Sequence, residues 1–180
     1  MDQLRERLLK LVDEGLGVNL AEIAAKANKS IEEISMQHDA GADSLELVEV
    51  VMGAEDLAGI TLSDEEMEKL TNVGEFLELI LAKAKIREQF LGVLNSASQL
   101  TSEQLTCLNG AVLLKKITNG ADVRTKEQAN KGIPPLELSN WQETVNCFIA
   151  EQGLNVQDSD LKKVENFGGL ITLFYQRSLK

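Results

Sequence analysis

The sequence has few of the residues on which many enzymes and metal sites depend. Its 180 residues include one histidine, His38, and two cysteines, Cys107 and Cys147. A single histidine argues against a Ser-His or Cys-His catalytic pair and removes most histidine-based metal sites. Two cysteines do not make a disulfide framework, so we expect a reducing, cytoplasmic environment. We therefore predict a protein that is not an enzyme, with no catalytic residue and no metal site.

Positive charge and long apolar runs are also scarce. The chain has 18 Lys and Arg residues against 29 Asp and Glu residues, which gives a net charge of -11. Such an acidic chain is a poor electrostatic match for nucleic acid or an anionic membrane. No apolar run approaches the roughly 20 residues that span a bilayer, and the first residues do not resemble a secretory signal. We predict no nucleic-acid partner and no membrane insertion.

Charge and aromatic residues are divided unevenly along the chain. Residues 1–85 contain 19 acidic and 8 basic residues, whereas residues 86–180 contain 10 of each. Only one aromatic residue, Phe76, precedes position 86, and the other six follow it. This change in composition predicts two domains, 1–85 and 86–180. Because residues 83–90 lack glycine and proline, we expect a helical connection between the domains.

Apolar residues recur at helical spacing in much of the chain, and no segment alternates as a strand does. Helices are predicted from about residue 4 to Gly15 and over 44–58, 64–70 and 73–84, with a long loop and at most one short helix at 18–42. In the second half we expect helices broken near 96–101 and 119–120, a polar loop from 120, and helical segments again from Trp141 and Phe167. The fold class is all-α: a small four-helix bundle followed by a second helical domain.

The segment 44–58 is the most informative part of the sequence. Asp43 and Glu46 form a capping box, which marks the start of a helix. One apolar stripe, which includes Val50 and Ala54, has the spacing of a core face. A second apolar group lies beside the acidic residues and consists of Leu45, Val48 and Met52. Periodicity leaves two alternatives for this group: it packs under the loop at 18–42, or it stays exposed as a docking strip for a partner with a basic rim.

Residues 41–80 resemble the acyl carrier proteins. They read GADSLELVEVVMGAEDLAGITLSDEEMEKLTNVGEFLELI. The family's Asp-Ser-Leu motif appears as Asp43, Ser44 and Leu45 at the start of a helix of the family's length. Asp64-Glu65-Glu66 and Thr71-Asn72-Val73 lie at the family's distances from the serine, and LGVNLAEI at 16–23 resembles its first loop. The resemblance covers about residues 1–85. Several extra residues from Ser30 onward, including Met36 and His38, depart from the pattern and suggest a specialised carrier.

The resemblance implies a carrier of acyl groups. A phosphopantetheinyl transferase would attach 4'-phosphopantetheine from coenzyme A to Ser44, and acyl groups would be carried as thioesters on that arm. Asp43 would cap the helix and help the transferase to organise Mg²⁺. The free N–H groups of the first turn would favour the phosphate. The implied pathway is fatty-acid, polyketide or related lipid biosynthesis.

The resemblance also implies a docking surface for acyl-transferring and synthase enzymes with basic patches. The matching positions are Glu46, Val48, Glu49, Met52, Asp56 and Glu68. Ala54 and Leu70 match positions that line the family's acyl chamber. The alternative is an adaptor that keeps the carrier fold, is never modified, and binds partner proteins through its acidic helix.

The second half repeats part of the first at a spacing of 94 positions. Residues 59–77 then align with 153–171, and Gly59, Asp64, Lys69, Asn72 and Gly74 meet identical residues. This predicts a degenerate carrier-like unit without the attachment serine. Leu138 takes the place of that serine, with Ser139 next to it. The alternative is an unrelated helical cap of similar spacing. Cys107 and Cys147 fall within apolar helical patterns, so we predict that both are core thiols.

Overall fold

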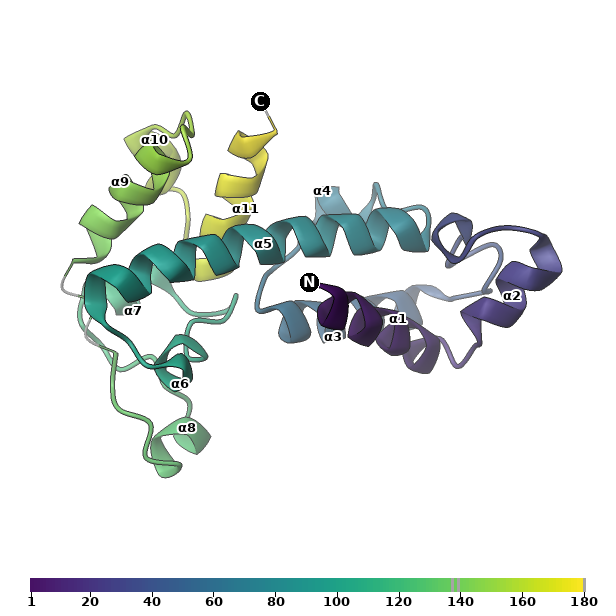
Figure 1. Cartoon of the computed structure of the whole chain (residues 1–180), viewed down its shortest axis with the longest axis horizontal. Helices are drawn as coiled ribbons and strands as arrows, with labels where there is room; N and C mark the ends of the chain where they lie inside the picture. Colours follow the sequence, from purple (N-terminus) through teal and green to yellow (C-terminus); the bar gives the residue numbers. More distant parts are fainter. Residues whose placement is uncertain (137, 139, 180) are drawn as a thin grey trace. The chain divides into compact units, whose positions relative to one another are not determined.

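The computed structural model describes residues 1–136, 138 and 140–179 (Figure 1). In this part of the chain 63% of residues are helical, in eleven α-helices, and no strand forms. The all-α prediction is therefore confirmed, whereas the four-helix bundle stays a prediction. Glu137 and Ser139 lie outside the described residues, so the structure does not address a role for Ser139.

The chain divides into two compact units. The first unit comprises Met1–Ala58 and Leu62–Ala82, and the second comprises Gly59–Thr61 and the described residues from Lys83 onward. Helix α5 (Val73–Ser98) continues without a break through 83–90, so the prediction of a helical connection is confirmed. The segment Gly59–Thr61 belongs to the second unit although the first unit precedes and follows it in sequence.

The first unit contains more regular structure than the sequence indicates. Two elements occupy the predicted long loop at 18–42, because Asn19 Oδ1 accepts a hydrogen bond from Glu22 N at 3.1 Å and Ser30 and Glu33 form a capping box. The predicted helix at 64–70 is shorter than expected, because the chain leaves the helical hydrogen-bonding pattern after Met67. The unit consists of α1 (Asp2–Gly15), α2 (Leu20–Ala27), the 3-10 helix Ile31–Glu33, α3 (Ser44–Ala58), α4 (Asp64–Met67) and the start of α5.

Helices α1 and α3 pack closely against each other (Figure 1). A Cβ on Gly15 would lie 2.6 Å from Val50 Cγ2, and one on Gly53 would lie 2.9 Å from Leu11 Cδ1. Both distances are too short for carbon atoms in contact, so each glycine permits the close approach. Ala54 is also buried at this face of α3, as the predicted core stripe requires.

The extra residues ahead of α3 form a closed turn. Asp39 accepts hydrogen bonds from Lys29 Nζ at 2.6 Å and from Ser35 N at 2.9 Å. The bond from Lys29 is the main cause that lowers the pKa of Asp39 below its ordinary value. Met36 is buried in the unit, whereas His38 is exposed. The departure from the carrier pattern is thus an ordered part of the first unit.

The second unit is built from the remaining helices. The predicted polar loop from residue 120 is wrong in part, because it contains a short helix, α8, whose first turn is held by a hydrogen bond from Gln128 N to Thr125 Oγ1 at 3.2 Å. Thr101 caps α6, where its Oγ1 accepts a hydrogen bond from Gln104 N at 3.2 Å. The helices after α5 are α6 (Ser102–Leu105), α7 (Leu114–Thr118), α8 (Lys126–Asn130), α9 (Trp141–Glu151), α10 (Asp158–Leu161) and α11 (Phe167–Ser178).

The spacing of 94 positions recurs in the structure. Helices α4 and α5 begin at 64 and 73, and α10 and α11 begin at 158 and 167. Asn72 and Asn166 each accept a hydrogen bond from the backbone N–H three residues later, at 2.9 and 2.7 Å. The buried positions also correspond: Val73, Phe76, Leu77 and Ile80 in the first unit, and Phe167, Leu170, Ile171 and Phe174 in the second. The degenerate-carrier interpretation stays a prediction, now with matching helix starts and burial in its favour.

An aromatic cluster forms the core of the second unit, with Phe90 of α5 at its centre. The Phe90 ring centroid lies 5.5 Å from that of Trp141, 5.3 Å from Phe148, 5.9 Å from Phe167 and 5.6 Å from Phe174. These distances are in the range of favourable ring contacts. Because four rings contact Phe90, its removal leaves a cavity that no single neighbour can fill.

We expect Phe90→Ala to lower the free energy of unfolding by about 3–5 kcal/mol, the usual cost of such a cavity. Urea unfolding followed by the fluorescence of Trp141 measures this change. Gly92→Ala is the control on the same helix, because its Cβ meets no atom within 4 Å. It should be neutral or stabilise by about 0.5–1 kcal/mol. Equal costs for both variants would contradict the central role of Phe90.

Candidate functional site

Ser44 is the first residue of the 15-residue helix α3 and is exposed. Gly41, with φ +73°, turns the chain before the helix. Asp43 and Glu46 then form the predicted reciprocal cap: Asp43 Oδ1 accepts from Leu45 N at 2.8 Å and from Glu46 N at 2.9 Å, and Asp43 N donates to Glu46 Oε2 at 2.9 Å. Within the described residues, no hydrogen bond occupies the Ser44 hydroxyl. The helix start is therefore held by Asp43 and Glu46, while the hydroxyl is open to solvent.

The Asp43 cap reduces the number of backbone N–H groups in the first turn that are free to bind a phosphate. The sequence suggests free N–H groups at this turn, but the Asp43 carboxylate already accepts from Leu45 N and Glu46 N. That expectation is wrong for these two groups, because the N-cap satisfies them. A phosphate on Ser44 would also lie near two carboxylates in sequence, so the positive end of the helix dipole is partly offset.

The second apolar group of α3 is exposed. Leu45 is 66% exposed, Val48 48% and Met52 59%. The alternative in which these side chains pack under the loop at 18–42 is therefore wrong. The reason is that the core stripe of α3 already faces α1, which leaves the other side of the helix uncovered within the first unit. Three large apolar side chains spaced at three and four residues form an apolar strip, which is typical of a partner-binding surface.

Carboxylates accompany this apolar strip. Glu49 and Asp56 are exposed on the same helix. Glu46 is half-buried, and its carboxylate already accepts a hydrogen bond from Asp43 N, so it is not fully available to a partner. Glu68 is exposed just beyond α4 and is not part of α3. The structure thus places five of the six predicted partner-binding residues on α3.

The two residues that match the acyl chamber differ in burial. Ala54 is completely buried, whereas Leu70 is half-buried after α4.

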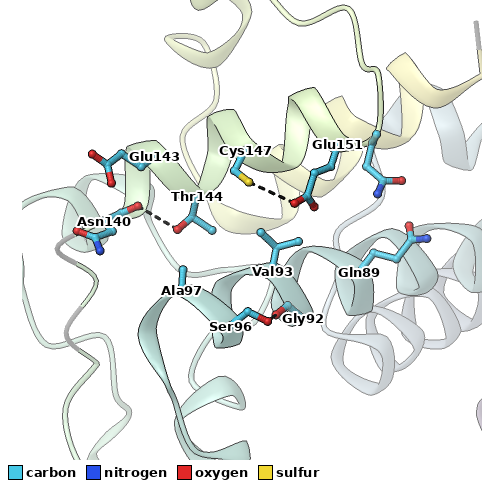
Figure 2. Close-up of a pocket in the computed structure, with 11 residues that line it drawn as sticks. Gln89, Gly92, Val93, Ser96, Ala97, Asn140, Glu143, Thr144, Cys147 and Glu151 are labelled. Atoms are coloured by element: carbon cyan, nitrogen blue, oxygen red, sulfur yellow. Dashed lines mark hydrogen bonds between the residues drawn. The ribbon is translucent and has the colours of Figure 1, made fainter.

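A groove in the second unit was not indicated by any motif. It has a volume of about 650 Å³ and lies between α5 and α9 (Figure 2). Small residues, among them Gly92 and Ala97, line it from α5. Polar residues from α9 and its N-cap, among them Glu143, Thr144 and Cys147, face them. Small residues recurring on one face of α5 were the available sequence signal, but such a pattern also fits ordinary helix packing.

Cys147 faces this groove and is exposed, so the prediction that it is a core thiol is wrong. The buried face of α9 consists of Trp141, Thr144, Val145 and Phe148, and Cys147 falls outside it. Its thiol donates a hydrogen bond to Glu151 Oε1, with an S–O distance of 3.4 Å. This carboxylate is the main cause that raises the pKa of Cys147. Cys107 is buried as predicted, and burial raises its pKa.

No model of a known protein family matches the chain. Among the residues that the structure describes, none of the helices is both long and apolar enough to cross a bilayer.

We expect Asp43→Ala to lower the free energy of unfolding by about 0.5–2 kcal/mol, because two N–H groups at the start of α3 lose their acceptor. Ser44→Ala should stay within about 0.5 kcal/mol of the wild type, since its hydroxyl is exposed. Urea unfolding followed by circular dichroism measures both changes. A Ser44→Ala cost as large as that of Asp43→Ala would mean that the serine is structural.

We expect Glu151→Gln to speed the alkylation of Cys147 by iodoacetamide at neutral pH. The glutamate raises the thiol pKa, so its neutralisation increases the fraction of reactive thiolate. Peptide mass analysis over time measures the rate. Glu143→Gln is the matched control, because Glu143 lines the same groove. An equal rate in wild type and Glu151→Gln would show that Glu151 does not control this thiol.

Proposed function

We propose that the chain is an acyl carrier protein that receives 4'-phosphopantetheine on Ser44 and presents acyl groups as thioesters. The observation that carries the proposal is the exposed Ser44 hydroxyl at the start of α3, immediately before an exposed apolar strip. An exposed hydroxyl that accepts or donates no hydrogen bond within the described part of the chain is accessible to a modifying enzyme. The Asp-Ser-Leu motif at this position supports the same function.

The residues around Ser44 have distinct roles in this proposal. Asp43 and Glu46 hold the first turn of α3, so the serine is presented on a fixed backbone. The modifying transferase supplies the base, which accounts for a serine site without a neighbouring histidine. Because Asp43 occupies two N–H groups of the first turn, we expect the arm to extend into solvent. The phosphopantetheine arm would supply the thiol, while the chain itself would hold the arm in place and bind the partner enzymes.

The apolar strip and its carboxylates serve as the docking surface. Leu45, Val48 and Met52 offer apolar contact, and Glu49 and Asp56 offer pairing to a basic rim. Charge complementarity of this kind raises the rate of encounter and selects partners, while desolvated apolar side chains contribute most of the affinity. The proposed partners are a phosphopantetheinyl transferase and acyl-transferring or synthase enzymes in the cytoplasm.

An unmodified adaptor is the second candidate function. An adaptor would use the same docking surface as a carrier. Neither function uses the chain's own thiols, and the raised pKa values of Cys107 and Cys147 disfavour the thiolate form of both. The two candidates differ at Ser44: a carrier requires this hydroxyl, whereas an adaptor does not. Modification is therefore the property that separates them.

The test is the intact mass after incubation of the full chain with coenzyme A, Mg²⁺ and a broad-specificity phosphopantetheinyl transferase. We expect the mass to rise by one phosphopantetheine in the wild type and to stay unchanged in Ser44→Ala. Ser102→Ala is the matched control and should be modified like the wild type. Ser102 is also an exposed serine that follows the N-cap of a helix, in this case α6.

Other outcomes have defined meanings. A rise by two phosphopantetheine groups would support the carrier and assign a second site, with Ser139 as the first residue to replace. No rise with several transferases would overturn the carrier in favour of the adaptor.

A further inference from the structure

The segment Gly59–Thr61 connects α3 to α4 but is packed within the second unit. Ile60, at its centre, is only 2% exposed. We propose that the second unit contains an intramolecular binding slot for this segment and holds the chain where it leaves α3. The proposal does not depend on the modification of Ser44. It gives the described residues from Lys83 onward a role that no sequence motif indicates.

Lys83 of α5 holds the carbonyl end of the segment. Its side chain is completely buried, and its Nζ donates hydrogen bonds to Thr61 O and to Thr172 Oγ1, both at 2.8 Å. Thr172 Oγ1 in turn donates to Thr61 O at 3.2 Å. The Lys83 ammonium also lies 6.0 Å from the centre of the Tyr175 ring. A buried ammonium is costly unless it is hydrogen-bonded, so its presence ties Thr61 O to one position.

Arg87, one turn further along α5, lies against the start of the segment. A Cβ on Gly59 would be 2.8 Å from Arg87 Nε and 2.9 Å from Cζ. Gly59 also has a φ of +66°, a backbone angle that residues with a side chain rarely adopt. The guanidinium is held by a hydrogen bond from its Nη2 to Leu108 O at 2.9 Å. Glycine is therefore required at position 59 for two reasons, conformation and space.

Two glycines of the second unit form the wall of the slot. A Cβ on Gly110 would lie 2.5 Å from Ile60 O, and a Cβ on Gly168 would lie 2.2 Å from Thr61 Oγ1 and 2.7 Å from Thr61 Cγ2. Gly168 N donates to Gly110 O at 2.9 Å, which joins the two sides of the wall. Any side chain at either position would push the segment out. The absence of side chains at Gly110 and Gly168 thus lets Ile60 and Thr61 lie directly against the backbone of the second unit.

The chain offers a matched pair of substitutions for the test. Gly168 and Gly169 are neighbours in the first turn of α11, but a Cβ on Gly169 would meet its nearest atoms only at 3.3 Å. Both changes to alanine add the same group and the same helix propensity. Only Gly168→Ala collides with Thr61, so the difference between the variants reports on the slot.

The measurement is hydrogen–deuterium exchange of the full chain, read in peptides that cover the end of α3 and the segment 59–61. We expect Gly168→Ala to speed exchange in these peptides about tenfold, because overpacking of this kind favours local opening. Gly169→Ala should leave their exchange unchanged. In a Thr61→Ala background, which removes the two closest atoms, the effect of Gly168→Ala should fall to less than about threefold.

Thr172→Val provides an independent test that adds no atoms to the slot wall. It removes one of the hydrogen bonds to Thr61 O while it keeps the shape of the side chain, and we expect faster exchange in the same peptides. Thr118→Val is its control, because among the described residues the Thr118 hydroxyl donates within its own turn, to Lys115 O at 3.2 Å. Equal exchange in Gly168→Ala and Gly169→Ala, or no change in Thr172→Val, would overturn the proposal. Loss of the slot with normal modification of Ser44 would leave the proposed function intact.

Discussion

Helix α5 is uninterrupted from Val73 to Ser98 and contributes buried residues to both cores of the molecule. Its first part contributes Phe76 and Ile80 to the core of the first unit, and its second part contributes Phe90 and Leu94 to the core of the second. A helix that serves two cores must run without a break between them, and the segment 83–90, which contains no glycine or proline, allows this. Because Lys83 and Arg87 lie on the same helix, α5 also supplies the side chains that hold Gly59–Thr61.

The two units treat charge in different ways. In the first unit, carboxylates cap helix starts, as Glu66 does at α4, and others, such as Glu49 and Asp56, are exposed beside the apolar strip of α3. The second unit buries the ammonium of Lys83 and much of the Arg87 guanidinium, and hydrogen bonds to backbone carbonyls compensate for part of that burial. An acidic, open surface suits transient partners, whereas buried cations suit a permanent intramolecular contact.

Local sequence was sufficient wherever neighbouring residues determine the structure. The helix at 44–58 and its cap follow from Asp43 and Glu46, and the predicted break near 96–101 lies between the end of α5 at Ser98 and the start of α6 at Ser102. Prediction failed where a polar segment that reads as a loop contains a helix cap. In this way α8 begins after its N-cap Thr125, within the expected loop. Prediction also failed for Cys147, since an apolar pattern does not show which face of α9 the neighbouring helices cover.

Caps and helical periodicity in the sequence are sufficient to predict the all-α class, the main helix starts and the exposure of Ser44, because these signals act over a few residues. The folded chain is needed to see that Leu45, Val48 and Met52 are exposed, because this depends on which face of α3 meets α1. It is also needed to see that Gly59–Thr61 belongs to the second unit, because the slot joins residues as far apart as Thr61 and Thr172. Contacts over such separations leave no period or motif in the sequence, since each partner residue has an ordinary local role as well.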